Sequence, residues 1–441
     1  MKVICKKYDE LINLISDFIS KSSVQIICFV LYKIIVDVIY IFCMSSWDSF
    51  GVLVDVQSII SGYLAVIIFS YFINRLQKME NASAIILLVI YMIYFVPITT
   101  YCGWGPGSSA LLFFMIVYAL LLSLLEIKLP RYSIKISYTG KSEKVLSVCF
   151  YMLFIAVGIL TLYIAYRYTG FRIITNLNDV YQYRAEIAEY DMPGWMARFQ
   201  SFSNILIPLL ILMAFVRKKI ILVLIGCAFL ILNFSYAGHK SIFFLGVIFF
   251  IGYFFWRKRM TCFFMPAGCI VGIIGILEYF FSSHAYIISW FFRRQGYTLA
   301  QLSDYYFRFF SENPTDIFRS TFLGKVGFSS PYALPIPSVI GNNYSTQTVS
   351  SNNGLLADVW SHLGVIGIII MPIILIVCFR LFDMATSGLP GRYFVGFAVY
   401  YAVSYSNTTW STILLTHGYL IMCIVFFLFP RNNMQESEAK T

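Results

Sequence analysis

Repeated apolar runs of bilayer length constrain this chain more than any other feature. A helix needs about 20 predominantly apolar residues to cross the ~30 Å hydrocarbon core of a bilayer. Of the 441 residues, 59% are hydrophobic and only 12% are charged, whereas a soluble globular domain has roughly 25% charged residues. The sequence therefore predicts an all-α, polytopic membrane protein, with residues 1–441 forming a single integral membrane domain. We expect about twelve spans, at residues 23–44, 57–74, 83–100, 109–125, 145–166, 200–216, 220–236, 242–256, 261–282, 354–379, 393–408 and 411–429.

The distribution of Lys and Arg predicts how these spans are oriented, because cytoplasmic segments are enriched in both residues. With the N-terminus in the cytoplasm, the cytoplasmic segments hold 21 Lys and Arg, the outward segments hold ten and the first span holds one. Arg217-Lys218-Lys219 and Arg257-Lys258-Arg259 fall in very short cytoplasmic loops, where the rule is strongest. We therefore expect both termini in the cytoplasm. The net charge of +11 then reflects topology and some attraction to anionic lipid headgroups, and it does not indicate nucleic-acid binding.

Two outward segments, 167–199 and 283–353, are much longer than the other connections. Long connections are usually functional or disordered, and the many aromatic residues in these two favour function. The outward segments carry eight Arg and two Lys, whereas the cytoplasmic segments carry eight Arg and thirteen Lys. Since a guanidinium grips phosphate in bidentate fashion, this bias favours a phosphate-bearing ligand, foremost at Arg184, Arg293 and Arg294. The alternative explanation is snorkelling and ion pairing with outward acids.

All four histidines lie at or near the outward face, where a histidine can act as a general base near neutral pH. His239 lies in the short turn between two apolar spans and directly precedes Lys240, one of the two outward lysines. The sequence is equally compatible with two roles for His239. It orients or deprotonates a hydroxyl, or it is an ordinary hydrogen-bonded histidine at a helix end. For Lys240, contact with a phosphate is favoured over snorkelling.

Two ionisable pairs inside predicted spans have i, i+4 spacing and so share a helix face. Such groups are costly in a membrane and are functional by default. For Lys33 and Asp37 on the first span, mutual neutralisation is the favoured interpretation. For Asp358 and His362, just below the 283–353 segment, structural and functional roles both remain open.

Neither the cysteines nor the acids predict a metal site. The ten cysteines lie mostly in apolar runs, and no pair has CxxC spacing, which is typical of thiols that serve as small apolar side chains. No outward segment has a DxD motif, a Gly-rich phosphate loop or a GxSxG motif. We therefore expect chemistry that uses no metal and no cofactor.

Several short motifs occur in the outward half of the chain over roughly residues 145–380. They are Tyr183-Arg184, Ala237-Gly238-His239-Lys240-Ser241, Arg293-Arg294, Tyr305-Tyr306-Phe307-Arg308-Phe309-Phe310-Ser311-Glu312-Asn313-Pro314, and Asn352-Asn353-Gly354-Leu355-Leu356-Ala357-Asp358-Val359-Trp360 running into Leu363-Gly364-Val365-Ile366-Gly367. In these motifs, and in its layout of many spans with two long outward segments, the chain resembles the Wzy-type O-antigen polymerases, also called oligosaccharide repeat-unit polymerases.

The resemblance implies a metal-independent membrane glycosyltransferase of the inner membrane, acting on an undecaprenyl-pyrophosphate-linked oligosaccharide at the periplasmic face. It also implies a chain-length regulator and a flippase of the same pathway as partners. In this interpretation Arg184, Lys240, Arg293 and Arg294 bind the pyrophosphate, because its departure needs charge stabilisation. The acceptor hydroxyl needs a general base, for which the candidates are His239, Asp358 and His362.

Two other functions remain open from the sequence. An O-antigen ligase would use the same donor with lipid A core as acceptor, and it shares chemistry and topology with the polymerase. A lipid-linked oligosaccharide flippase or another transporter belongs to a different class. Transporters often show internal repeats and mid-membrane charges, and here no repeat is evident and Lys33 with Asp37 is the one clear mid-membrane pair.

The charge distribution yields a direct test of topology. A reporter that fluoresces only in the cytoplasm, fused after Lys325, is expected to stay dark, because the rule places residues 283–353 outside. The same reporter fused after Lys219 is the matched control and is expected to fluoresce. Cytoplasmic fluorescence from the Lys325 fusion would contradict the predicted topology.

Overall fold

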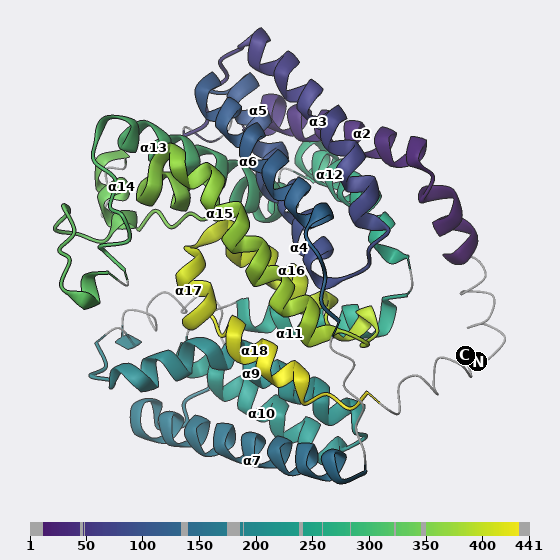
Figure 1. Ribbon diagram of the computed structural model, residues 1–441, viewed down its shortest axis with the longest axis vertical. Coiled ribbons are helices and arrows are strands. Elements are labelled where there is room, and N and C mark those ends of the chain that lie inside the picture. Colours follow the sequence, from purple (N-terminus) through teal and green to yellow (C-terminus); the bar gives the residue numbers. More distant parts are fainter. Residues whose placement is uncertain are drawn as a thin grey trace. The chain divides into compact units, whose positions relative to one another are not determined.

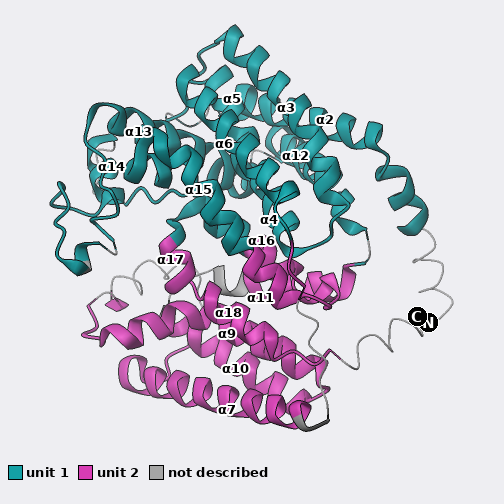
Figure 2. Cartoon of the chain, in the orientation of Figure 1, with its two compact units in different colours: residues 1–130, 257–379, 401–410 teal, residues 131–256, 380–400, 411–441 magenta. Residues whose placement is uncertain are grey.

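The computed structural model describes residues 12–431, except 45–46, 48, 134–139, 174–185, 188, 238–240, 258, 283, 322 and 345–349. Every regular element in the described part of the chain is a helix (Figure 1), as the sequence predicted. The chain divides into two compact units, each assembled from separate stretches of sequence (Figure 2). Unit 1 comprises residues 1–130, 257–379 and 401–410, and unit 2 comprises residues 131–256, 380–400 and 411–441.

Unit 1 is built around a helix whose side chains are almost all buried, formed by α4 (Ala82–Ile90), the π-helix η2 (Tyr91–Phe95) and α5 (Val96–Trp104). It is flanked by α2 (Ser22–Cys43), which lies alongside α3 (Val56–Gln77) and α12 (Phe264–Ser282) in Figure 1. The other helices of unit 1 are α6 (Ser109–Lys128), η4 (Met260–Phe263), η5 (Ile288–Tyr297), α13 (Thr298–Glu312), η6 (Gly324–Val326) and α14 (Ile336–Tyr344).

Unit 2 is organised around α10 (Ile220–Ala237), which packs beside both α7 (Gly140–Ile164) and α9 (Gly194–Val216), as Figure 1 shows. α15 (Leu356–Thr386) and α16 (Val395–Asn407) contribute residues to both units. The remaining helices of unit 2 are η3 (Ala165–Thr169), α11 (Ser241–Phe255), η7 (Gly391–Tyr393), α18 (Tyr419–Phe427) and most of α17 (Trp410–Leu415).

Nine helices among the described residues are long and apolar enough to cross a membrane, so the chain is a multi-pass membrane protein by helix length and hydropathy. Each of the twelve predicted spans coincides with a helix or a run of helices. The predicted spans 220–236, 242–256 and 393–408 fall on shorter helices. The 13 residues of α16 reach only about 20 Å at 1.5 Å per residue, less than the ~30 Å hydrocarbon core. The count of twelve crossings therefore stays a prediction, as does the single-domain organisation.

A buried ion pair joins three helices of unit 1. The Lys33 ammonium lies 2.5 Å from Oδ1 of Asp37 and donates to the Thr100 hydroxyl at 3.0 Å. The Tyr63 hydroxyl donates to Oδ2 of the same carboxylate at 2.8 Å. Both charged side chains are almost fully buried, and a buried pair is tolerable only when its remaining polar atoms are also satisfied. The geometry therefore supports a structural role for this pair, in which the two charges neutralise each other.

Segments assigned to the same side by the charge rule lie together within unit 1. The predicted outward segments 45–56, 101–108 and 283–353 contact one another, and the predicted outward segment 409–410 contacts the start of α15 at Asp358. The contacts are from the Leu53 N–H to the Trp104 carbonyl (2.9 Å), from the Ser108 N–H to Asp304 (3.2 Å), from the Gln301 amide to the Ser49 carbonyl (2.6 Å) and from the Trp410 N–H to Asp358 (3.1 Å). At the other end, Asn74 donates to Ser22 and Thr261 donates to the Gln77 carbonyl. Segments that the charge rule assigns to the same side are thus in contact within unit 1, and the orientation of the spans stays a prediction.

Gly354 fixes the start of α15 against the end of α16. Its N–H donates to the Ser406 carbonyl at 3.2 Å, and Asn353 beside it donates to the Leu299 carbonyl at 3.1 Å. A Cβ at position 354 would lie 2.0 Å from the Tyr405 carbonyl oxygen. The motif Asn353-Gly354 therefore has a packing role, because only glycine lets the two backbones approach this closely.

We expect Gly354→Ala to destabilise the protein by about 3 kcal/mol, because the helix must move away from the Tyr405 carbonyl or clash with it. Thermal unfolding of the purified protein in detergent measures this as a fall in Tm. Gly51→Ala is the matched control, since a Cβ there meets nothing within 4 Å. Equal Tm values for the two variants would show that the close approach does not constrain the fold.

Candidate functional site

A break in α15 organises the candidate site. The helix begins at Leu356, and its regular backbone is interrupted at Gly364, which has φ 55° and ψ −139°. Only glycine adopts such a conformation without strain. The carbonyls of Ser361 and His362, just before the break, accept hydrogen bonds from the N–H groups of Asp316 (2.9 Å) and Ile317 (3.1 Å). The loop that follows α13 therefore completes the hydrogen bonding of the interrupted helix.

This arrangement places His362 between two carboxylates. Its Nδ1 lies 3.2 Å from Oδ2 of Asp316, and its Nε2 lies 3.4 Å from Oδ1 of Asp358. The three side chains are 3% exposed or less. The structure thus brings together Asp358 and His362, as their i, i+4 spacing predicted, and it adds a third group from elsewhere in the chain.

Asp316 is the most heavily hydrogen-bonded member of this cluster. Its Oδ2 accepts from the N–H (2.8 Å) and the hydroxyl (2.7 Å) of Ser320, and its Oδ1 accepts from the Ser330 hydroxyl at 2.6 Å. Burial raises the pKa of this carboxyl, but the hydrogen bonds from His362, Ser330 and Ser320 outweigh burial and hold the pKa well below its usual range. Asp316 is therefore a fixed negative charge against Nδ1 of the imidazole.

The loop segment over the histidine is strained. Ile317 and Phe318 are consecutive non-glycine residues with φ 52° and φ 58°, a conformation that costs of order 1 kcal/mol or more for a β-branched or bulky residue. The Phe318 ring stacks on the imidazole at 4.3 Å between ring centroids, and the Phe318 N–H lies 3.3 Å from Nδ1. Strain of this kind persists where surrounding contacts over-determine it, and such residues cluster at functional sites.

Asp358 borders a pocket on the side away from Asp316. Its Oδ2 accepts from the Trp410 N–H at 3.1 Å, whereas its buried Oδ1 has no hydrogen bond of normal geometry. Asp358, Tyr118 and Trp410 help to line a narrow pocket. The Tyr118 hydroxyl and the Trp410 indole N–H are also buried without a hydrogen-bond partner among the described residues. The pocket is too narrow to hold a water molecule, so a substrate hydroxyl reaches Asp358 only when the lining side chains move.

The arginines of the predicted outward segments differ in their partners. Arg308 is 2.7 Å from the buried Asp304, and Arg172 is 2.9 Å from Glu186, so ion pairing accounts for these two. Burial raises the pKa of Asp304, and Arg308 partly offsets this. Arg293 and Arg294, on η5, have no acidic partner within the described part of the chain. The Arg293 guanidinium instead bonds the Ser289 hydroxyl at 3.0 Å and lies 5.4 Å from the centre of the Trp47 ring, and Arg294 is exposed.

The remaining predicted site residues, Arg184, His239 and Lys240, lie outside the described residues. Arg293 and Arg294 lie on a different helix from Asp358 and His362, and the described contacts of Arg293 do not include either residue. Within the described ranges, no group of three His, Cys, Asp or Glu side chains is arranged to hold a metal ion.

Sequence reasoning missed Asp316 as a member of the site. It lies 46 residues before His362 and reaches it through the fold of the 283–353 segment, so no local spacing could have signalled it. The pocket partners Tyr118 and Trp410 were missed for the same reason, because they belong to other helices.

Comparison of the chain with protein-family models, curated proteins and solved structures finds no match. The resemblance to the O-antigen polymerases is therefore carried by the motifs alone, and a proposal of function must be argued from the geometry of the candidate site.

Asp316→Asn should lower stability by about 1–3 kcal/mol at pH 7, because it removes a buried, hydrogen-bonded charge. The folded-state pKa of Asp316 is depressed, so the stability that its charge contributes is present above the unfolded-state pKa of about 3.9 and is lost as the pH falls below that value. Thermal unfolding in detergent at a series of pH values is the measurement. The gap in Tm between wild type and Asp316→Asn should narrow below about pH 4.

The exposed Glu312, at the end of α13, provides the matched control. Glu312→Gln should leave Tm within the error of wild type at every pH. A Tm gap for Asp316→Asn that is the same at pH 7 and pH 3 would mean that its charge does not support the loop.

Proposed function

We propose that this protein is a metal-independent membrane glycosyltransferase that polymerises undecaprenyl-pyrophosphate-linked oligosaccharide repeat units into O-antigen polysaccharide at the periplasmic face of the inner membrane. The observation that carries the proposal is the buried cluster of Asp358, His362 and Asp316 next to a small pocket, at the end of unit 1 where the predicted outward segments meet. A buried, incompletely bonded carboxylate in such a position is a candidate general base.

In this reaction an acceptor hydroxyl attacks the anomeric carbon of the sugar at the reducing end of the growing chain. The bond from that carbon to the pyrophosphate oxygen breaks, and undecaprenyl pyrophosphate leaves. Asp358 takes the proton of the attacking hydroxyl, since its Oδ1 has no hydrogen bond of normal geometry and it lines the pocket. His362 positions Asp358 and is itself held by Asp316.

The leaving pyrophosphate requires positive charge, which arginine can supply without a metal. Arg293 and Arg294 are the described residues assigned to this role, because neither is neutralised by an acid there. Arg184 and Lys240 are assigned the same role on their sequence motifs. Aromatic platforms for sugar faces are present on the same outward segment, where the Tyr305 and Tyr344 rings stack at 4.4 Å.

His239 remains an alternative base on its sequence position alone. The O-antigen ligase and the flippase or other transporter remain the alternative functions. The flippase is less favoured, because the Lys33–Asp37 pair, the one clear mid-membrane pair, is fully engaged in helix packing.

Deletion of the protein in its native host, followed by gel analysis of lipopolysaccharide, tests the proposed function. Loss of a polymerase should leave core that bears a single repeat unit, because ligation and flipping still operate. Restoration of the full ladder by the wild-type chain on a plasmid is the control. Core without any repeat unit would contradict the proposal and assign the protein as a ligase or flippase.

The role of Asp358 is tested in the same complementation assay. Asp358→Asn should lower polymer formation by about 100-fold or more, the range of general-base catalysis, with normal amounts of protein in the membrane. Glu312→Gln, which changes an exposed acid of the 283–353 segment, should support a normal ladder. A normal ladder from Asp358→Asn would remove Asp358 from the mechanism and leave His239 and His362 as the candidate bases.

A further inference from the structure

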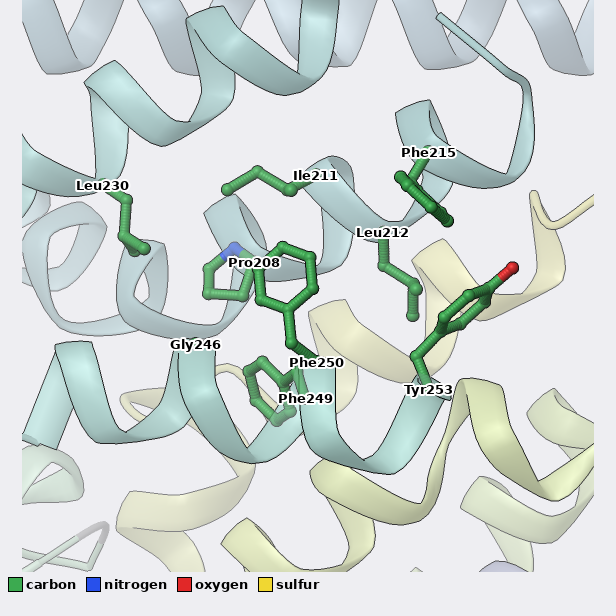
Figure 3. A pocket seen from close by; sticks show the side chains of 9 residues that line it. All are labelled: Pro208, Ile211, Leu212, Phe215, Leu230, Gly246, Phe249, Phe250 and Tyr253. Carbon is green, nitrogen blue, oxygen red and sulfur yellow. The ribbon is translucent and has the colours of Figure 1, made fainter. Parts of the chain in front are cut away.

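Unit 2 contains two adjoining pockets of opposite character. The larger, of about 940 Å³, is lined by Arg217, Lys218, Lys219 and Arg392, with Glu143 as the opposing acid. The smaller is a shallow apolar pocket of about 20 Å³ between α9, α10 and α11 (Figure 3). Phe215 and Tyr253 line both pockets, and their rings meet edge to face with centroids 5.2 Å apart. The charged pocket and the apolar pocket thus share two aromatic side chains in their linings.

The basic pocket gathers segments that the charge rule places in the cytoplasm. Its five charged lining residues lie in predicted cytoplasmic segments, and they are Glu143, Arg217, Lys218, Lys219 and Arg392. Most of the other lining residues lie near the cytoplasmic ends of predicted spans, on α7, α9, α10 and α11. Basic pockets between spanning helices on the cytoplasmic side bind anionic lipid headgroups. Tyr151, Tyr253 and Tyr393 also line it, and tyrosine is enriched at the depth of the headgroups.

Two guanidinium groups in this pocket are incompletely compensated. Arg217 donates to the Ser147 hydroxyl at 2.7 Å and lies 5.0 Å from the centre of the Phe150 ring, yet its buried Nε has no acceptor. Burial lowers the pKa of Arg217. Arg392 lies over the rings of Tyr253 and Tyr393, and its buried Nε also lacks an acceptor. An anion in the pocket would stabilise both desolvated charges.

The turn that carries the two lysines has a strained backbone conformation at Lys218. The Lys219 N–H bonds the Ala214 carbonyl and the Lys218 N–H bonds the Phe215 carbonyl, both at 2.9 Å, which is the hydrogen-bond pattern of a Schellman cap. The left-handed position of this cap usually holds glycine, but here it holds Lys218 with φ 58°. The fold therefore accepts strain to place a cation at the mouth of the basic pocket.

We propose that the two pockets together bind an anionic phospholipid of the cytoplasmic leaflet. Its phosphate lies among Arg217, Lys218, Lys219 and Arg392, and one acyl chain lies against Phe215 and Tyr253 and over the shallow apolar pocket. The adjoining apolar space favours a lipid over a soluble anion, and so does the exposed apolar surface next to the turn, where Ile220 is 61% exposed. The site is independent of the catalytic proposal, because it lies in unit 2 and its binding is measured directly.

The test is lipid binding to the purified full-length protein, measured by native mass spectrometry in a neutral detergent. Phosphatidylglycerol is expected to bind at least tenfold more tightly than phosphatidylcholine with the same acyl chains. Lys218→Gln with Lys219→Gln should weaken phosphatidylglycerol binding about tenfold or more, as expected for two cations near a headgroup. Arg75→Gln with Lys78→Gln, which removes two exposed charges from another predicted cytoplasmic segment, is the matched control and should change binding less than twofold.

A second pair of measurements separates the two halves of the site. Gly246→Leu fills the apolar pocket, where an added Cβ meets only Leu230 at 3.5 Å, and should weaken phosphatidylglycerol binding several-fold. Glycerol phosphate, the headgroup without chains, should bind at least tenfold more weakly than the lipid. Equal binding of phosphatidylglycerol and phosphatidylcholine, equal effects of the pocket and control variants, or glycerol phosphate binding as tight as the lipid would each overturn the proposal.

Lys218→Gly separates lipid binding from fold stability. Glycine relieves the left-handed strain at this cap, so Tm should rise, while the loss of one cation should weaken phosphatidylglycerol binding several-fold. A rise in Tm with unchanged lipid affinity would show that Lys218 plays no part in the site.

Discussion

A backbone carbonyl inside a bilayer has no water to bond, so any break in a spanning helix must be repaired by donors from the protein. In α15 the break at Gly364 is repaired by the N–H groups of Asp316 and Ile317. The same repair brings the Asp316 carboxylate to His362 and drives Ile317 and Phe318 into strained conformations. Hydrogen bonding to the interrupted helix thus accounts for three features: the position of the loop after α13, its strained backbone, and the placement of the Asp316 carboxylate beside His362.

The all-α, multi-pass character could be predicted because apolar length is a local property of the sequence. Each predicted span coincides with a helix or a run of helices. Hydropathy does not fix where a helix ends, and α16 shows the consequence. Its 13 residues, Val395–Asn407, fill only part of the predicted span 393–408, because the 3₁₀-helix η7 precedes it and its last turn packs against Gly354 at the start of α15. The hydropathy of a segment carries no information about such tertiary contacts, so the ends of the helix cannot be predicted from it.

The site was partly predictable for a related reason. Residues i and i+4 of a helix share a face whatever the tertiary fold, so the spacing of Lys33 with Asp37 and of Asp358 with His362 was enough to identify both pairs. Asp316 reaches His362 only because the 283–353 segment folds back over α15. Gly364 lay in a motif that the sequence identified, but its left-handed conformation depends on donors from that same segment.

The two buried pairs differ in how completely their charges are compensated, and this difference separates structure from function. In the first pair both oxygens of Asp37 accept hydrogen bonds, from Lys33 and Thr100 on one side and Tyr63 on the other. In the second, Oδ1 of Asp358 is 3.4 Å from the imidazole and has no hydrogen bond of normal geometry. A buried carboxylate oxygen whose partner lies 3.4 Å away is less well compensated than one that accepts close hydrogen bonds. A substrate hydroxyl would complete the hydrogen bonding of this oxygen, and the less compensated pair is therefore the one to which we assign the proposed chemistry.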